Sequence, residues 1–132
     1  MGYWLVKSEP SVYSYEDLVR DKQTVWDGVR NSLAQRHLRA MARGDLVLIY
    51  HSGKERAVVG IATVVSTSSA APGGGEVLVE LKPEEKLGQP IPLTAIKADP
   101  AFADFPLVRL SRLSVMPVAT AQWKALVAKG RS

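Results

Sequence analysis

The chain has 132 residues, of which 46% are hydrophobic and 23% charged, and its formal net charge is +4. These values are typical of one globular domain, here residues 1–132, and exclude a chain that is disordered throughout or divided between two cores. The chain has no cysteine, which excludes disulfides, thiolate zinc sites, iron–sulfur clusters and a thiol nucleophile.

The first predicted elements are a strand and a short helix. Residues 3–7 are rich in β-forming side chains and Pro10 disfavours helix before it, so we expect a strand that ends in a turn. Ser14 is a suitable N-cap for a helix that reaches about Arg20, with acidic residues in its first turn.

A second helix is predicted from residue 31 or 32 to residue 43. Ser32 and Gln35 match a capping box, apolar residues recur on one face, and Gly44 is suited to close the helix. This helix directly follows the most unusual tract of the chain.

The middle of the chain predicts strands. Residues 46–50 are continuously apolar, as in a strand buried on both faces, and residues 57–65 read as a longer strand that pairs with it in a hairpin. Gly60 marks a bulge or a close approach to its backbone. The small and polar residues 66–75 predict a flexible loop, and the alternation over 77–81 predicts a further strand.

The last third predicts a brief helix at 95–98 capped by Thr94, a strand region over 107–115 with a bulge or twist, and a helix from 120 to 129 closed by Gly130. Strands separated by short helices, without regular βαβ spacing, indicate an α+β fold. We expect a curled, mostly antiparallel β-barrel with short helices packed around it.

Residues 26–31, Trp-Asp-Gly-Val-Arg-Asn, combine an aromatic plane, a flexible turn, a guanidinium group and an amide. These groups suit a flat polar ligand such as a nucleobase, because stacking on an aromatic ring contributes about 1–3 kcal/mol per base. Trp4 and Trp123 lie within regular apolar patterns and are assigned to packing, whereas Trp26 lies in a turn-like tract and is assigned to the ligand.

Two other residues of this tract have competing interpretations. Arg30 is able to bind a base edge or a phosphate, or to form an ion pair with Asp27 or Asp45. Asn31 is able to read an amide-like base edge, or to cap the following helix. The cap is the preferred interpretation for Asn31.

Two polar triplets end predicted strands and are expected to converge with this tract: Lys7-Ser8-Glu9 and Tyr50-His51-Ser52. Ser8, His51 and Asp45 also supply the residue types of a hydrolytic triad. Ser8 lies in no nucleophile motif, however, so catalysis is not expected. The two histidines of the chain have no metal-site spacing, and no metal or other cofactor is predicted.

Several arginines are candidates for phosphate contacts. Residues 106–132 carry five basic residues and no acidic one, which gives weight to a nucleic-acid partner, although a solvated basic surface fits equally well. The candidates on the predicted helix and in this segment are Arg36, Arg39, Arg109 and Arg112.

Seven segments in sequence order resemble the EVE domain family, whose fold is similar to PUA and YTH domains. They are YWLVKSEP at 3–10, WDGVRN at 26–31, LRAM at 38–41, GD at 44–45, YHS at 50–52, VGIA at 59–62 and RLSV at 112–115. The chain departs from the family pattern at residues 66–71, which replace an aromatic and acidic segment, and at Ser32, where an aromatic residue is common.

The resemblance implies a PUA-like barrel that accepts one modified nucleobase, such as a modified cytosine, and implies no catalytic activity. The pocket residues that it implies are Lys7, Ser8, Glu9, Trp26, Val29, Arg30, Asn31, Tyr50, His51, Ser52 and Ser114.

We therefore expect a non-enzymatic, monomeric, cytoplasmic reader of DNA or RNA that carries a modified base. No run of 18 apolar residues and no signal-like segment is present, so no membrane association is expected. Two alternatives stay open: an RNA-binding PUA-like module involved in RNA modification, and a hydrolase or nuclease that acts on modified nucleic acid.

Overall fold

The computed structural model describes residues 2–69 and 77–131. The strands are β1 (Tyr3–Ser8), β2 (Thr24–Trp26), β3 (Leu46–His51), β4 (Ala57–Ser69), β5 (Val77–Pro92) and β6 (Val115–Pro117). The helices are α1 (Tyr15–Asp21), α2 (Ser32–Ala40), α3 (Leu93–Ala98), the 3-10 turn η1 (Pro100–Phe102), α4 (Pro106–Arg109) and α5 (Thr120–Arg131). None of the helices in these two ranges has the length and apolar character that crossing a membrane requires.

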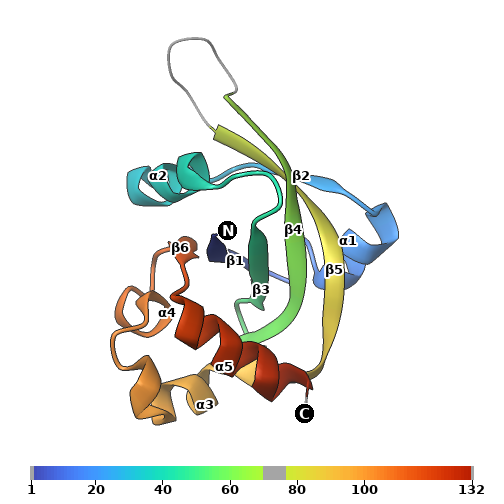
Figure 1. The fold of residues 1–132 in the computed structure, drawn as a ribbon. Coiled ribbons are helices and arrows are strands. Elements are labelled where there is room, and N and C mark those ends of the chain that lie inside the picture. Colours follow the sequence, from blue (N-terminus) through green and yellow to red (C-terminus); the bar gives the residue numbers. More distant parts are fainter. Residues whose placement is uncertain (1, 70–76, 132) are drawn as a thin grey trace.

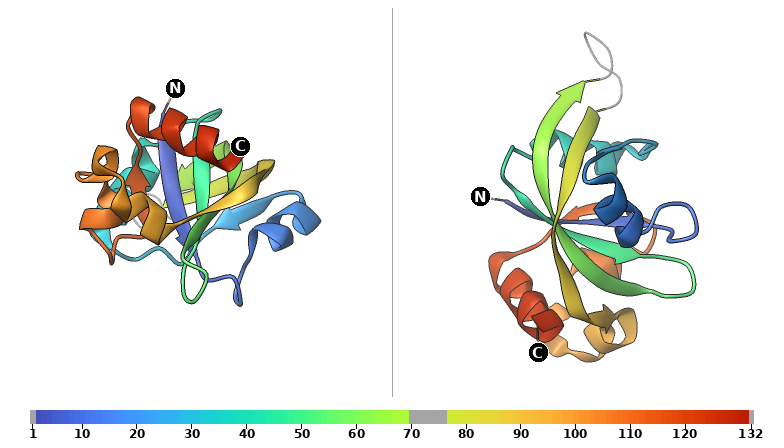
Figure 2. Two further views of the ribbon diagram at one scale, coloured as in Figure 1. Left: turned by 90° about the horizontal axis from the view of Figure 1, so that it is seen from below. Right: turned by 90° about the vertical axis from the view of Figure 1, so that its right-hand side faces the viewer.

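The six strands form one mixed sheet in the order β2-β5-β4-β3-β1-β6. β1 and β3 are parallel, and every other pair of neighbours is antiparallel. The sheet is strongly twisted and curls into a half-barrel, and α5 crosses one end of it and packs against β5 (Figures 1 and 2). The predicted curled, mostly antiparallel sheet with short helices around it is confirmed.

The curl is concentrated in the long β4–β5 hairpin, whose register shifts at three places, one of them between Val58 and Gly60. Gly60 is also a point of close approach, because a Cβ atom there would lie 2.4 Å from Cε1 of Tyr15. Tyr15 is the first residue of α1, and its hydroxyl donates a hydrogen bond to the Ile61 carbonyl at 2.9 Å. The prediction for Gly60 is therefore confirmed, and the approaching group is a tyrosine ring.

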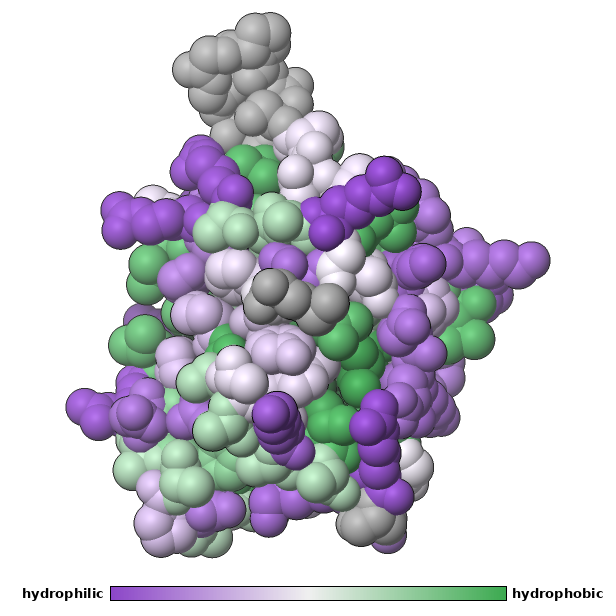
Figure 3. All heavy atoms as spheres, viewed as in Figure 1, coloured by the Kyte–Doolittle hydropathy of each residue, from purple (hydrophilic) through white to green (hydrophobic). Residues whose placement is uncertain are grey.

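The core fills the inside of the curled sheet and the space beneath the helices. Trp4 and Trp123 are buried, as predicted: Trp123 stacks on Tyr3 with ring centroids 4.6 Å apart, and the Trp4 indole donates to Asp45 at 3.0 Å. On the face shown in Figure 3, hydrophilic side chains project around the rim and hydrophobic residues gather between them.

The start of α2 differs from the predicted capping box. Asn31 is the N-cap and accepts a hydrogen bond from Ala34 N at 3.0 Å, so the preferred interpretation of Asn31 is confirmed and the Ser32 cap is wrong. Gln35 turns inward instead, where it donates to Val29 O and accepts from Val77 N, each at 2.7 Å. The helix ends at residue 40, before Gly44, which lies in the following turn.

The predicted strand over 107–115 is wrong for most of its length. Pro106 begins α4, since its fixed φ suits the first turn of a helix, and a further turn bonds Leu113 N to Leu110 O. Only residues 115–117 pair with β1. The predicted helix closure at Gly130 is also wrong, because Gly130 lies inside α5 against Leu87.

Two smaller predictions also change. Residues 66–69 belong to β4 and pair with β5, so the predicted loop is wrong there. The rest of the predicted loop, residues 70–75, lies outside the described residues. The helix α3 begins at Leu93 after Pro92 and has no side-chain cap, so Thr94 does not cap it.

Candidate functional site

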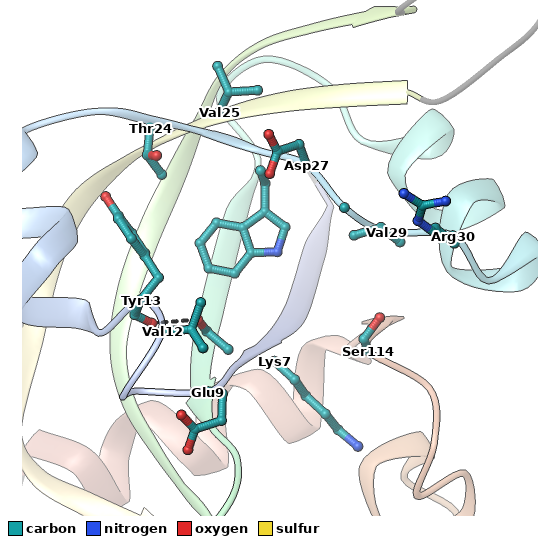
Figure 4. Close-up of a pocket in the computed structure, with 13 residues that line it drawn as sticks. Lys7, Glu9, Val12, Tyr13, Thr24, Val25, Asp27, Val29, Arg30 and Ser114 are labelled. Atoms are coloured by element: carbon teal, nitrogen blue, oxygen red, sulfur yellow. Dashed lines mark hydrogen bonds between the residues drawn. The ribbon is translucent and has the colours of Figure 1, made fainter.

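A cavity of about 580 Å³ opens where β1 ends and β2 begins, and we call it the Trp26 cavity. Its size lies within the range of about 300–1,000 Å³ that is usual for small-molecule sites. It is lined by Lys7, Ser8, Glu9, Val12, Tyr13, Thr24, Val25, Trp26, Asp27, Gly28, Val29, Arg30 and Ser114. Three segments far apart in the sequence therefore meet here, as Figure 4 shows.

The aromatic part of the cavity consists of Trp26 and Tyr13. Their rings meet edge to face, with centroids 6.2 Å apart and planes at 86°. The Tyr13 hydroxyl donates to Asp21 at 2.9 Å, which fixes the ring, and burial raises the pKa of Tyr13. Trp26 remains only partly buried, so part of the indole is available to a ligand.

Trp26 is held by an edge strand that the sequence analysis did not predict. As the last residue of β2 it pairs with Val79 of β5. The chain then turns at Gly28, whose φ of 74° favours glycine, and Val29 is buried. Gln35 joins Val29 O to Val77 N, so the Trp26 tract is fixed to β5 on both sides of the turn.

Polar groups from the end of β1 line the opposite side of the cavity. The Ser8 hydroxyl donates to Tyr13 O, which leaves its oxygen able to accept. Both the hydroxyl and the backbone N–H of Ser11 donate to Glu9, and these bonds hold the pKa of the Glu9 carboxyl below its usual value. Lys7 N donates to Ser114 O at 2.9 Å and so places Ser114 at the cavity.

The rim carries both charged and apolar groups. Asp27 and Arg30 are exposed, and neither forms an ion pair within residues 2–69 and 77–131, so the predicted alternative of an Arg30 ion pair is wrong there. Val12 is 80% exposed and Val25 44% exposed. In Figure 4, Tyr13 and Thr24 lie on one side of the cavity and Ser114 on the other. A ligand would therefore meet apolar surface and both signs of charge.

The triplet Tyr50-His51-Ser52 does not join this cavity, contrary to the expectation. His51 is 3% exposed, its Nε2 accepts from Tyr15 N at 3.0 Å, and its Nδ1 lies 2.8 Å from Glu55. It therefore joins α1 to the β3–β4 turn. Tyr50 and Ser52 line a separate cavity of about 320 Å³, which we call the basic cavity.

Asn31 and the four arginines predicted to contact phosphate do not line the Trp26 cavity. Asn31 lines a shallow hollow of about 370 Å³, together with Leu33 and the segment 109–113 that includes Arg109 and Arg112. Arg36 and Arg39 are exposed on α2. All four candidate arginines are thus exposed, and their phosphate contacts stay a prediction.

The residue types of a hydrolytic triad are present but not assembled. Ser8 and His51 are neighbours in the β1–β3 register, yet Ser8 donates to Tyr13 O and both ring nitrogens of His51 have other partners. Asp45 accepts from Gly2 N, Ala42 N and the Trp4 indole instead of orienting the histidine. Within the described ranges, no three histidine, aspartate or glutamate side chains are grouped so that they could hold a metal ion.

The sequence analysis missed several lining residues: Val12, Tyr13, Thr24, Val25, Asp27 and Gly28. Asp27 and Gly28 belong to the tract at residues 26–31 but were not among the predicted pocket residues. A signal for Val12 and Tyr13 was available, since they directly follow the predicted strand-ending turn, and loops after strands often carry binding residues. Nothing local to Thr24 or Val25 indicates that they form an edge strand.

A model of the EVE domain family matches residues 2–129. Thymocyte nuclear protein 1 of Mus musculus is 44% identical over 76 residues, which cover 48% of this chain and 34% of that protein. The aligned region thus spans about a third of the length of the curated relative.

Two solved structures are similar over almost the whole chain. A Rhodopseudomonas palustris protein solved by NMR has 41% identity and a TM-score of 0.91, with 98% of this chain and 93% of that chain covered. The human THYN1 protein, solved in complex with 5-methylcytosine-containing DNA, has 25% identity and a TM-score of 0.88, with 100% and 99% covered.

Proposed function

The chain belongs to the EVE domain family, and we propose that it is a non-enzymatic nucleic-acid-binding protein that holds one modified base, of the modified-cytosine type, in the Trp26 cavity. The observation that carries the proposal is the open cavity in which the half-buried Trp26 indole lies among hydrogen-bonding groups and exposed valines. The human THYN1 protein bound to 5-methylcytosine-containing DNA supports DNA as the partner.

Stacking on Trp26 would supply much of the affinity. A base stacked on an aromatic side chain gains about 1–3 kcal/mol, and such a contact tolerates any base. Tyr13 meets the Trp26 ring edge to face and fixes its plane, so less freedom is lost when a base binds. A base that has left its strand would meet a preformed surface.

Polar groups around the cavity complement the edge of a cytosine. Cytosine presents an amino donor at N4, and carboxylates accept from this group. Asp27 and Glu9 both line the cavity, and the hydrogen bonds from Ser11 favour the charged form of Glu9. The Ser114 hydroxyl supplies a donor for the acceptors of the base.

The rim valines are suited to a methyl group on the base. One methyl or methylene group in a hydrophobic pocket contributes about 1–3 kcal/mol, or about 10-fold to 200-fold in discrimination. Val12 and Val25 are exposed and line the cavity, so contact with a ligand would remove their apolar surface from water. We expect the preference for a methylated over an unmodified cytosine to lie within this range.

The chemistry of the site supports a binding role without catalysis. Ser8 has no base to accept its proton, since His51 uses both ring nitrogens elsewhere. One chain supplies the whole cavity, which suits a monomer that acts as a single domain. Incubation with methylated DNA or RNA, followed by mass spectrometry, tests this directly, and any cleaved or altered product would contradict it.

A titration with three oligonucleotides tests the proposal. They differ only in one cytosine, which is unmodified, methylated or hydroxymethylated. Loss of the stacking surface in Trp26→Ala should weaken binding of the preferred oligonucleotide by about 5-fold to 150-fold. Trp26→Phe keeps a ring and should recover most of the affinity. Equal binding of all three oligonucleotides by the wild type and by Trp26→Ala would reject the pocket.

The same titration with RNA of identical sequence separates the alternative of an RNA-binding module. Recognition of the 2′-OH would favour RNA, whereas a pocket that reads only the base would bind both backbones with similar preference among the three cytosines.

A further inference from the structure

The basic cavity lies on the other side of Lys7 from the Trp26 cavity. It has a volume of about 320 Å³ and is lined by Lys7, Tyr50, Ser52, Gly53, Arg56, Leu93, Lys97, Leu107, Val108 and Ser111. In the described part of the chain, Lys7 alone lines both cavities. A ligand group in the basic cavity would therefore be a near neighbour of a ligand in the Trp26 cavity.

Among the residues that the structure describes, three cationic side chains and no acidic one line the basic cavity. Lys7, Arg56 and Lys97 form no ion pair with a carboxylate within residues 2–69 and 77–131. The Glu9 carboxylate lies close to Gly53 at the edge of this cavity, so it offsets only part of the positive charge. An anion that binds among the three cations would reduce their mutual repulsion.

Lys7 and Tyr50 form the inner wall of the basic cavity. The Lys7 ammonium donates to Ser111 O at 2.8 Å and lies 5.8 Å from the centre of the Tyr50 ring, so two of its three N–H donors remain for a ligand. Burial lowers the pKa of Lys7, and an anion beside it would raise that pKa again. Tyr50 is 4% exposed, and no hydrogen bond of its hydroxyl occurs among the described residues.

Arg56 is held at the mouth of this cavity by an uncommon backbone conformation. Its φ is 49°, in the left-handed region that favours glycine. Arg56 Nε donates to Gly53 O at 3.2 Å and Arg56 O accepts from Leu93 N at 2.8 Å, so the turn is fixed on both sides. The remaining guanidinium N–H groups are able to form the paired hydrogen bonds that suit phosphate oxygens.

We propose that the basic cavity binds a phosphate group, and that in a nucleic-acid complex this is the backbone phosphate next to the base held in the Trp26 cavity. The assignment to a backbone phosphate rests on the proposed function, whereas phosphate binding by this cavity does not. Lys7 lies between the two cavities, so a base in one and a phosphate in the other would be separated by about one side chain, as a base and its adjacent backbone phosphate are. The cavity thus supplies sequence-independent affinity, while the Trp26 cavity supplies base preference.

Lys97→Gln, with Lys54→Gln as the matched control, tests the proposal on the intact protein. Lys54 is exposed in the β3–β4 turn and lines neither cavity, so both variants lose one charge from the same region. Lys97→Gln should weaken the binding of methylated and unmodified oligonucleotides by the same factor, about 5-fold to 10-fold. It should also lower the magnitude of the slope of log affinity against log salt by about 1. Lys54→Gln should change either value far less.

Inorganic phosphate provides the second arm, because it needs no base. Titration at constant ionic strength should shift the amide NMR signals of Gly53 and Ser111 saturably in the wild type, and Lys97→Gln and Arg56→Gln should reduce these shifts. An oligonucleotide with a neutral methylphosphonate beside the modified base should lose the Lys97 effect if the phosphate comes from the backbone.

Several results would overturn the proposal. Equal behaviour of Lys97→Gln and Lys54→Gln in both arms would reject the cavity as a phosphate site. A loss of base preference in Lys97→Gln would assign the cavity to base reading instead. If the wild type bound inorganic phosphate at Gly53 and Ser111 but bound no oligonucleotide, the proposed function would be wrong and a free phosphate would be the ligand.

Discussion

Substitution of Gly60 by alanine should strongly destabilise the protein, because the half-barrel closes on α1 at this point. An added Cβ atom would lie 2.4 Å from Cε1 of Tyr15, whereas carbon atoms in contact are about 3.5–4.0 Å apart. The ring would have to move by about 1 Å. Tyr15 is 1% exposed and donates a hydrogen bond to Ile61 O, so it has no free space in which to move.

The structure sets the size of this effect between two limits. Overpacking that the core absorbs costs about 1–3 kcal/mol, and complete expulsion of a buried aromatic ring costs about 3–5 kcal/mol. We expect about 3 kcal/mol for Gly60→Ala. Only Ser14 separates the Val12–Tyr13 segment from Tyr15, so displacement of the Tyr15 ring should also weaken base binding at the Trp26 cavity.

Urea unfolding followed by circular dichroism measures the effect. With a slope of about 2 kcal/mol per molar urea, the midpoint of Gly60→Ala should fall by about 1.5 M. Gly130→Ala is the comparison: its Cβ would lie 2.7 Å from Leu87 Cδ1, a smaller overlap than at Gly60, and alanine gains about 1 kcal/mol inside a helix, so its midpoint should fall much less than that of Gly60→Ala. An unchanged midpoint for Gly60→Ala, or an equal cost in a Tyr15→Ala background, would refute the packing argument.

Three further predictions concern α2, acid stability and His51. Asn31→Ala should cost about 1 kcal/mol and Ser32→Ala much less, because only Asn31 caps α2; equal unfolding midpoints would contradict this. Burial raises the pKa of Asp45, but hydrogen bonds from two backbone N–H groups and the Trp4 indole outweigh it and lower the pKa below its usual value. The stability from Asp45 is then complete above the pKa of an unfolded aspartate, about 3.9, and is lost as pH falls through the lower folded value, so Asp45→Asn should flatten the loss of stability below about pH 4. His51→Ala should lower the free energy of unfolding by about 2 kcal/mol without changing base preference; a changed preference would return His51 to the ligand site.

Much of the fold could be predicted from the sequence, because its signals are local. The β1, β3 and β4 strands have apolar patterns that show burial directly, and Ser14 caps α1 as predicted. The prediction for residues 107–115 was wrong because the local pattern there is ambiguous. Leu107 and Leu113 are buried in the turns that follow Pro106 while Leu110 is exposed, and leucines spaced in this way do not distinguish a strand from short helical turns.

The candidate site could be predicted only in part. Lys7, Ser8 and Glu9 were identified because they end a predicted strand, and the Trp26 tract because it combines an aromatic ring with polar groups before a predicted helix. The structure brings the two segments together at one cavity. The division between the two cavities could not be predicted, since it depends on which way side chains point at the parallel ends of β1 and β3. Tyr50 therefore belongs with the cations of the basic cavity.

The most direct test of the base-reading pocket is an NMR measurement on the complex with an oligonucleotide that carries a single 5-methylcytosine. We predict nuclear Overhauser contacts between the 5-methyl protons or the ring proton of that base and the ring protons of Trp26 and Tyr13. Contacts of the base with Leu33 and Leu110 in the shallow hollow, and none with Trp26, would place the ligand outside the Trp26 cavity and contradict the proposal.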